Sequence, residues 1–291
     1  MEETQLSLSI ILKRIKEDFN LTNAVLAAAL LCDEATISRY LANKVKMSED
    51  KAILLKEYVS KVLEKDIYND YIFKFEDDGY YFHGSRQGIM GEIRHDYSDR
   101  KHIDFSTGFY LGESFKQSST FIAEENNGKD RIYRFIFDKE GLTSLELSGL
   151  NWVFFIAYNR KKIPDTPENQ SLIRKMRRIV NSDYDYFVGD IADDRMSRNM
   201  ELFFDDALTF GQLQKCLTQL RVGKQYCLRT EKAVKRLKYT GIYILDDGLR
   251  YLIKEYASEK RDDAIDASNK ISSTTDNDGL KFSSLLQKYG K

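Results

Sequence analysis

Two short segments in the first half of the chain bring together residue types that can hold a ligand. The first, Tyr81-Phe82-His83-Gly84-Ser85, is an aromatic run that favours a strand and ends in a sharp turn. Because Gly84 has no side chain, a ligand can approach the backbone there, and His83 lies beside those backbone groups. The second segment, Gly108-Phe109-Tyr110, also favours a strand and leads into small polar residues. Aromatic faces and small polar groups therefore recur at short intervals beside exposed backbone.

The two segments belong to a series of motifs that follow one another along the chain. These are His83-Gly84-Ser85, Asp104 to Tyr110, Trp152 to Arg160, Tyr184 to Asp194, and Gln225 to Ala233. The series resembles the mono- and poly-ADP-ribosyltransferase fold, in the branch whose His-Tyr-Glu (or Gln) triad is spread over three strands. It is most similar to a poorly characterised bacterial family of that fold, found among toxin and phage-defence proteins. The resemblance covers roughly residues 70 to 240, and it depends on the order of the motifs, because any one of them alone is a weak signal.

The resemblance implies that the chain uses NAD and that His83, Tyr110 and Gln225 form the catalytic triad. It implies that the backbone of Gly84 holds the nicotinamide carboxamide, that His83 bonds the adenosine ribose, and that Ser85 belongs to the same cofactor-binding turn. Tyr110 is then expected to pack against the nicotinamide or its ribose.

Two further residues follow Tyr110 at offsets that poly-ADP-ribosyltransferases use. Ser118 stands eight positions after Tyr110, and Phe121 stands eleven positions after it. The resemblance implies that Ser118 bonds the carboxamide and that Phe121 stacks on the other face of the nicotinamide ring.

Gln225 departs from the glutamate of the best-known members. A glutamate there bonds the 2-hydroxyl of the nicotinamide ribose and stabilises the transition state by its charge as well. Glutamine keeps the hydrogen bond and lacks the charge, so we expect single transfer rather than chain elongation. The sequence does not decide which residue would act as the base that activates an acceptor. Asp193, Asp194 and Glu231 are candidates by carboxylate chemistry, and a turn with a helix cap is the alternative explanation for each.

Composition limits the class of protein. The 291 residues are 42% hydrophobic and 31% charged, as in a soluble globular protein large enough for one big or two ordinary domains. Three cysteines and three histidines, scattered along the chain, argue against a metal site or a disulfide framework. No apolar run reaches the length of a membrane span and the first residues do not resemble a signal peptide, so we expect a cytoplasmic protein. A formal net charge of -1 provides no bulk attraction to nucleic acid.

Residues 1–67 are predicted to form a separate all-α domain. Short helices at residues 23–31 and 34–42, capped by Thr22 and Asp33, resemble the helix-turn-helix of an Xre/Cro-type repressor. That resemblance leaves Thr36, Ser38 and Arg39 near the surface as candidate contacts to operator DNA. Acidic and basic side chains balance over this region, however, and carboxylates at the start of the second helix would repel phosphates. A small helical domain that docks a partner or a second protomer is an equal alternative.

Residues 68–240 are predicted to form an α+β domain with the split β-sheet that the resemblance implies. The expected strands are residues 78–83, 105–110, 131–137, 185–189 and 225–229, and the expected helices are residues 118–125, 151–160, 168–180 and 211–220. Residues 241–291 are predicted to hold one helix, residues 247–257, and a mobile polar segment, residues 258–278. An amphipathic stretch from Leu280 to Tyr289 could dock on the domain or on a partner.

The expected helix after Pro167 is strongly amphipathic. Its apolar residues recur at intervals of three and four, and a basic set, Arg174, Lys175, Arg177 and Arg178, falls largely on the other face. We interpret this face as a solvated helix surface; the alternative is contact with an anionic substrate such as RNA, DNA or the pyrophosphate of NAD.

The sequence thus predicts an NAD-dependent mono-ADP-ribosyltransferase that modifies a protein, RNA or DNA. It resembles the toxin of a toxin-antitoxin or phage-defence system, which implies an antitoxin partner. Two alternatives remain open. One is a DNA-binding regulator that senses NAD or ADP-ribose without turnover, and the other is an NAD glycohydrolase with water as the acceptor.

Overall fold

The computed structural model describes residues 3–74, 78–96, 104–124, 126–191, 194–219, 223–273 and 279–290. The fold is α+β, as expected, and the chain forms two compact units. Unit 1 combines Met1–Met90, Ser114–Ile136 and Tyr239–Glu259, and unit 2 combines Gly91–Glu113, Phe137–Lys238 and Lys260–Lys291. One limit of these units, between Lys238 and Tyr239, lies close to the predicted domain limit at residue 240, whereas none lies near residue 67.

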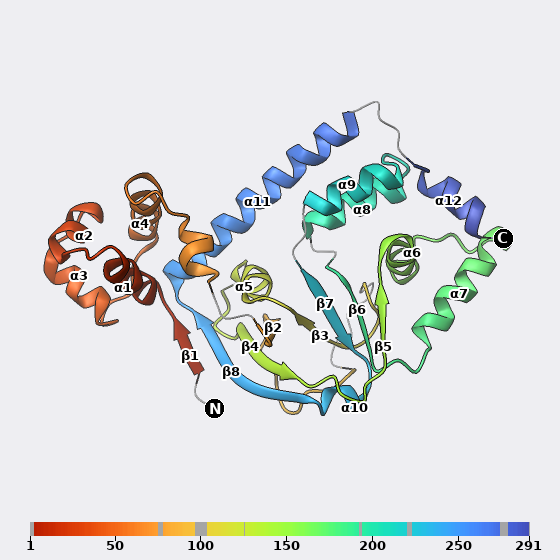
Figure 1. The fold of residues 1–291 in the computed structure, drawn as a ribbon, viewed down its shortest axis with the longest axis horizontal. Helices are drawn as coiled ribbons and strands as arrows, with labels where there is room; N and C mark the ends of the chain where they lie inside the picture. The colour runs from red at the N-terminus through yellow and green to blue at the C-terminus, as the bar shows by residue number, and fades with distance from the viewer. Residues whose placement is uncertain are drawn as a thin grey trace. The chain divides into compact units, whose positions relative to one another are not determined.

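Unit 1 begins with short helices (Figure 1), of which α2 (Asn23–Ala29) and α3 (Glu34–Leu41) correspond to the helices predicted at residues 23–31 and 34–42. The others are α1 (Leu8–Asp18), α4 (Glu49–Lys61) and the π-helix η1 (Ile67–Ile72), which was not predicted. Thr22 and Asp33 cap α2 and α3 as expected. Their side chains accept hydrogen bonds from the backbone N–H groups of Val25 at 3.2 Å and Thr36 at 2.5 Å. The predicted domain boundary at residue 68 falls inside η1, whose apolar residues are buried.

The strands of unit 1 lie in the order β1-β8-β4-β2. Their bounds are β1 Glu3–Leu6, β2 Tyr81–Ser85, β4 Arg131–Phe137 and β8 Leu237–Leu245. β1 pairs with β8 in parallel, and β2 pairs with β4 in antiparallel register. Helix α5 (Phe115–Ala123) packs on β2, with the rings of Phe82 and Phe115 edge to face at 6.1 Å. Ser114 starts α5 in a capping box with Gln117.

The N-terminal helices share one hydrophobic core with the strands of unit 1. Buried residues of α1, α2, α3, α4 and η1 join Phe82, Phe115 and Leu245 in a single cluster. At Gly248, which follows β8, an added Cβ would lie 2.8 Å from the carbonyl oxygen of Met47 and 2.9 Å from a methyl carbon of Leu8. The helices therefore form part of unit 1 and not a lobe attached to it by a linker.

The strands of unit 2 lie in the order β3-β7-β6-β5. Their bounds are β3 Phe109–Gly112, β5 Ser144–Leu147, β6 Tyr186–Asp190 and β7 Lys224–Leu228. The helices are α6 Gly149–Asn159, the 3-10 helix η2 Pro167–Asn169, α7 Gln170–Val180, α8 Asp194–Phe204, α9 Phe210–Gln219, α10 Glu231–Val234 and α12 Phe282–Tyr289. The core of unit 2 contains Trp152, Phe155, Met176, Phe187 and Phe203. All five predicted strands are present, within a few residues of their expected ends, and β1, β5, β8 and α8 were not predicted.

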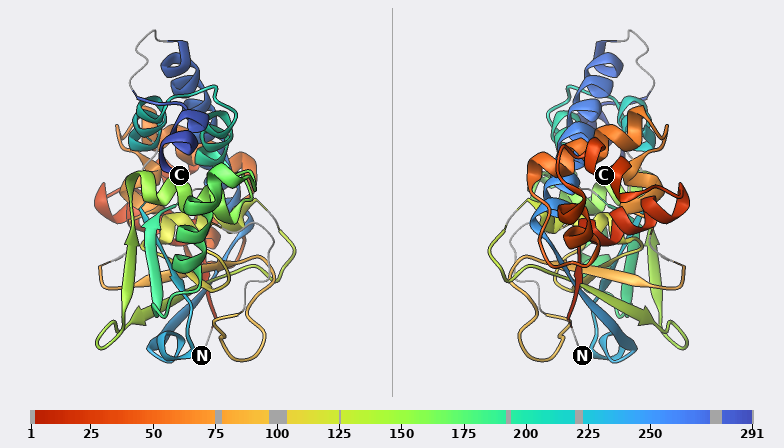
Figure 2. Two further views of the ribbon diagram at one scale, coloured as in Figure 1. Left: turned by 90° about the vertical axis from the view of Figure 1, so that its right-hand side faces the viewer. Right: turned by 90° about the vertical axis from the view of Figure 1, so that its left-hand side faces the viewer.

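The C-terminal part of the chain differs from expectation. Helix α11 (Asp247–Ser273) continues far beyond Ala257, through most of the segment predicted to be polar and mobile. α12 docks on unit 2, which decides between the two alternatives for this stretch. The ring of Phe282 lies 5.0 Å from that of Phe204, and the carbonyl of Gly290 accepts a 3.2 Å bond from Ser171 N. α12 and α7 lie side by side (Figure 2, left).

No helix in the described ranges has both the length and the apolar character needed to cross a bilayer.

Candidate functional site

Three of the residues predicted to hold nicotinamide lie together in unit 1. Gly84 on β2 faces α5, where an added Cβ would stand 2.8 Å from the carbonyl oxygen of Ser118 and 3.2 Å from a ring carbon of Phe121. Ser118 is buried, with 6% of its surface exposed. This close packing by itself requires glycine at position 84, so the glycine has a structural reason as well as the predicted one.

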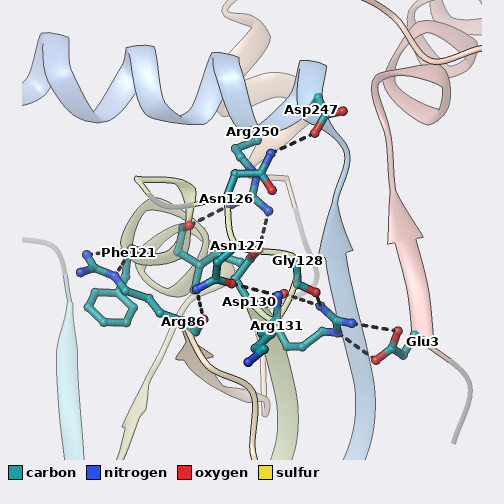
Figure 3. Close-up of polar contacts among 12 residues, drawn as sticks. Glu3, Arg86, Phe121, Asn126, Asn127, Gly128, Asp130, Arg131, Asp247 and Arg250 are labelled. Carbon is teal, nitrogen blue, oxygen red and sulfur yellow. Dashed lines mark hydrogen bonds and ion pairs between the residues drawn. The ribbon is translucent and has the colours of Figure 1, made fainter.

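Arg86, just beyond β2, covers the ring of Phe121. Its guanidinium carbon lies 4.4 Å from the ring centroid, its Nε and Nη2 donate to the carbonyl of Phe121 at 3.3 Å, and it forms a 3.0 Å ion pair with Glu124. Asn127 donates a 2.8 Å bond to the carbonyl of Arg86 and so ties the turn after β2 to the loop after α5 (Figure 3). Nothing in the sequence indicates that a cation lies against Phe121.

The loop after α5 also contains Asp130, which forms a buried ion pair with Arg250. Asp130 is 1% exposed, and Arg250, on α11, also donates a 2.9 Å bond to the carbonyl of Ile122 on α5 (Figure 3). The pair therefore fixes α5, which carries Ser118 and Phe121, against α11.

His83 and Ser85 point to the other face of β2, because successive side chains of a strand alternate. The imidazole lies 6.2 Å from the ring of Tyr133, its partner on β4. Ser85 donates a 3.1 Å bond from its hydroxyl to the carbonyl of Gly88 and holds the turn that follows the motif.

Tyr110 lies in unit 2, where its hydroxyl is engaged in the turn before β3. It donates a 2.5 Å bond to the carbonyl of Ser106 and accepts a 3.3 Å bond from Phe105 N. Burial raises the pKa of Tyr110 well above its ordinary value, so the phenol stays protonated. On β7, Cys227 pairs with Tyr110, and burial raises the pKa of this thiol to about 12. Both groups are neutral near pH 7, and the side chain of Tyr110 packs against the hydrophobic core of unit 2.

Gly108, the first residue of the Gly-Phe-Tyr motif, is explained by contact with β7. An added Cβ would lie 2.3 Å from Sγ of Cys227 and 2.8 Å from the carbonyl oxygen of Leu228. Any side chain at position 108 would force β3 away from β7.

Gln225 occupies the second position of β7 and is the least satisfied polar side chain of the predicted triad. Its Nε2 is buried and has no hydrogen-bond partner among the residues that the structure describes. The residues that pair with it on the two neighbouring strands are Gly112 on β3 and Gly189 on β6. No side chain of either neighbouring strand therefore lies beside it. A buried amide donor without an acceptor calls for an explanation, and a bound ligand is one.

Polar contacts join the remaining motifs of unit 2 to one another. Arg160 donates from Nε at 2.9 Å and Nη2 at 2.7 Å to the carboxylate of Asp104, and Trp152 donates from Nε1 to the carbonyl of Asp190 at 3.0 Å. Asp104 belongs to the motif that ends in Tyr110, and Trp152 and Arg160 bound the next motif. Residues of different motifs therefore bind one another and stabilise the fold of unit 2. The spacing within each motif did not indicate this structural role.

Asp185, at the start of the fourth motif, is bound by residues of the fifth. Its carboxylate accepts hydrogen bonds from Thr230 at 2.8 Å, Lys232 at 3.1 Å and the backbone N–H of Thr143 at 2.9 Å. Burial alone would raise the pKa of Asp185, but these donors outweigh it and lower the pKa to about 2.

The carboxylates predicted to activate an acceptor do not lie together. Asp193 is outside the described residues, and Asp194 begins α8, where its side chain is not described. Glu231 lies beyond the far end of β7 from Gln225 and forms an exposed 2.7 Å ion pair with Lys235. Glu113, which the sequence did not single out, accepts bonds from Lys224 N at 3.2 Å and the hydroxyl of Tyr226 at 2.8 Å. Tyr226 follows Gln225 directly, so its side chain points to the opposite face of β7.

The candidate DNA contacts lie on α3 as expected. Ser38 and Arg39 are exposed, and Thr36 is partly buried. Arg39 folds back on its own helix, where its Nε donates to the carbonyl of Ala35 at 3.3 Å. Asp33 is engaged as the cap of α3, and its backbone hydrogen bond with Thr36 lowers its pKa.

Comparison with known proteins identifies a family for the strands and helices just described. No curated protein and no solved structure matches the chain. A family model described as "Protein of unknown function (DUF3990)" matches residues 80–239, more than half of the chain, from the start of β2 into β8. The matched range includes His83, Tyr110 and Gln225. The chain therefore belongs to the DUF3990 family.

Proposed function

We propose that the chain is an NAD-dependent mono-ADP-ribosyltransferase that modifies a macromolecule, of the kind used as a toxin in toxin-antitoxin or phage-defence systems. The single observation that carries the proposal is the amide of Gln225, a buried donor without an acceptor at the third triad position. A ribose hydroxyl supplies the acceptor that this amide lacks, and the carbonyl end of the same side chain can accept a bond from that hydroxyl.

The arrangement in unit 1 supports the same proposal. Gly84, Ser118 and Phe121 are adjacent, so a backbone N–H and C=O, a hydroxyl and an aromatic ring come from one small region. A carboxamide needs one donor and one acceptor, and a nicotinamide ring needs an aromatic face. These three residues supply those groups.

The reaction requires little covalent chemistry from the protein. The bond between the nicotinamide nitrogen and ribose C1 breaks with both electrons leaving on nicotinamide, and a nucleophilic atom of the acceptor forms the new bond to C1 and loses its proton. The contribution of Gln225 is to orient the ribose with a neutral dipole. Without a carboxylate at that position, single transfers are expected.

Incubation of the purified protein with adenylate-labelled NAD and cell lysate tests the proposal. Label is then followed into protein, RNA, DNA and small molecules. The variants His83→Ala and Gln225→Ala are compared with His95→Ala and Gln214→Ala, which remove the same residue types away from the motifs. We expect label in one macromolecular fraction for the wild type and both controls, and a loss of about a hundredfold or more for the two site variants.

Two outcomes contradict the proposal. Label found only in free ADP-ribose identifies an NAD glycohydrolase. NAD that stays intact in every fraction, with circular dichroism confirming that the protein is folded, removes the transferase hypothesis and favours a regulator that binds NAD without turnover.

A further inference from the structure

Helix α7 presents a face of a single charge sign at the outer edge of unit 2, beside α6 and α12 (Figures 1 and 2). Its apolar residues Leu172, Ile173 and Met176 are buried. The exposed residues between and after them are all basic: Arg174, Lys175, Arg177 and Arg178. We call these four residues the α7 basic face.

The α7 basic face has no acidic counterpart in the part of the chain that the structure describes. None of its four side chains forms an ion pair there, and the single hydrogen bond recorded for them joins Lys175 Nζ to Asn151 at 3.2 Å. α7 itself contains no Asp or Glu, and the nearest acids in the sequence, Glu168 and Asp183, lie before and after it. Two exposed cations elsewhere in unit 2 do have acidic partners, Lys235 with Glu231 and Arg236 with Asp138.

The spacing of these cations is unfavourable for an isolated helix. Arg174 has like-charged neighbours three and four positions on, at Arg177 and Arg178, and Lys175 has another at Arg178. Like charges at these spacings destabilise a helix, whereas solvated helix faces commonly alternate in sign. The helix dipole favours cations only in the last turn, which accounts for Arg177 and Arg178 and not for Arg174. A polyanion bound to this face would remove the repulsion.

We propose that the α7 basic face binds the phosphodiester backbone of a nucleic acid, so that the acceptor in the proposed transfer reaction, on which this inference rests, is RNA or DNA. Arginine side chains present planar forks that match phosphate oxygens, and three of the four cations are arginines. Arg174 and Arg178 lie one helical turn apart, about 6 Å along the axis. A nucleic acid strand carries one phosphate per roughly 3.4 Å, so the row covers about two phosphates. Contacts to phosphates do not distinguish one base from another, so we expect binding that does not depend on base sequence.

Fluorescence anisotropy with the full chain tests the proposal. The probes are a single-stranded RNA and a single-stranded DNA of the same base sequence, without NAD. The triple variant Arg174→Gln, Arg177→Gln, Arg178→Gln is compared with Lys235→Gln, Arg236→Gln, Lys238→Gln, which removes the same charge from exposed positions elsewhere in unit 2. We expect the first triple to raise Kd at least tenfold and to lower the slope of log K against log salt by about 2, and the second to leave both unchanged.

The proposal is supported if the wild type binds either probe tightly and only the α7 triple variant loses that binding. The probe that binds then shows whether the ligand is RNA, DNA or both. Equal binding by wild type and α7 triple, or equal loss in both triples, overturns it. Competition by poly-glutamate as effective as competition by unlabelled RNA also overturns it, because the face would then suit an acidic protein. Nicotinamide release from NAD is measured separately. If nucleic acid binds as expected while NAD stays intact, the transferase proposal fails and the nucleic acid surface stands.

Discussion

In the proposed ADP-ribosyltransferase site, Gln225 places a neutral side chain where the best-known members of that fold have a glutamate. Its amide is buried, without an acceptor, and flanked by glycine on both neighbouring strands. As the bond to nicotinamide breaks, positive charge builds up on the ribose, and a neutral dipole stabilises that charge less than a carboxylate does. The protein is therefore expected to be a slow enzyme.

Replacing Gln225 with glutamate is predicted to speed nicotinamide release from NAD. The substitution nearly preserves side-chain volume and adds a negative charge beside the ribose, so we expect the rate constant to rise by about tenfold, equivalent to ~1.4 kcal/mol of barrier. The measurement is single-turnover release of nicotinamide with saturating NAD. Gln214→Glu, on the exposed face of α9, is the control and should react at the wild-type rate. A Gln225→Glu variant that is folded and slower than wild type would show that this side chain does not face the reacting ribose.

The resemblance assigned Gly84, Ser118 and Phe121 to one nicotinamide site. These three residues lie together in unit 1, and the roles assigned to them stay predictions. Long-range polar partners were not predictable in the same way. Asp104 and Arg160 are separated by 56 positions, and nothing in the spacing of either motif indicates that they form an ion pair. Arg86 against Phe121 is a second contact of this type.

Among the elements of unit 2, β5, β6 and α10 meet at a single carboxylate. Asp185 precedes β6, takes bonds from Thr143 before β5, and takes others from Thr230 and Lys232 at the start of α10. Its side chain is 7% exposed. The loss of this carboxylate would leave donors at two other elements, β5 and α10, without this acceptor.

The contribution of Asp185 to stability is predicted to depend on pH. Its pKa is about 2 in the folded protein and ~3.9 when unfolded. A lowered pKa stabilises the fold above the unfolded value, and this stabilisation is lost as the pH falls from about 4 towards 2. Asp185→Asn should therefore lower the free energy of unfolding by about 2 kcal/mol at pH 6.5 and by clearly less at pH 3. Urea unfolding of the wild type and the variant at pH 6.5 and pH 3 measures this change in the free energy of unfolding.

The exposed neighbour Asp183→Asn is the control for Asp185→Asn and should change stability by less than about 0.5 kcal/mol at either pH. A loss for Asp185→Asn that is equal at pH 6.5 and pH 3 would show that the hydrogen bonds, and not the charge, account for its effect.

Of the elements that the sequence analysis missed, β1 and β5 have weak local signals, whereas β8 is long and rich in Tyr, Thr and Ile, which favour strands. β1 and β5 are only four residues long, and each becomes a strand by pairing with a partner far away in the sequence, β1 with β8 and β5 with β6. Helix α11 was cut short because its second half is polar. That half is richest in Asp and Ser, which have low helix propensity, so its local composition does not indicate the helix that it forms.

At the scale of the whole molecule, the predicted boundary near residue 68 reflects a change in composition that does not coincide with a break in packing. The helices before it and the strands after it bury apolar side chains in one core. β1 extends the strand order of unit 1 beyond β8, and Leu8 N donates a 3.3 Å bond to the buried carboxylate of Asp246. Burial raises the pKa of Asp246, and its bonds to Leu8 and Leu249 oppose that rise. Composition reports local preference, whereas a domain boundary is defined by the contacts that cross it.

A chain that begins at residue 68 is therefore predicted not to fold. Its loss of β1 would leave the edge of β8 unpaired, and its loss of α1–α4 would expose the surface of α11 around Gly248, where Leu8 and Met47 now pack. We expect an aggregated product without a cooperative thermal transition, as measured by circular dichroism and size-exclusion chromatography. The control keeps the full chain and replaces exposed apolar residues of the same helices, Val25→Ser and Leu31→Ser, which should leave the melting temperature within a few degrees of wild type. A truncated chain that is monomeric and releases nicotinamide at the wild-type rate would instead establish residues 1–67 as an independent domain, and the shared core would then contribute little to the fold of the strands that carry His83.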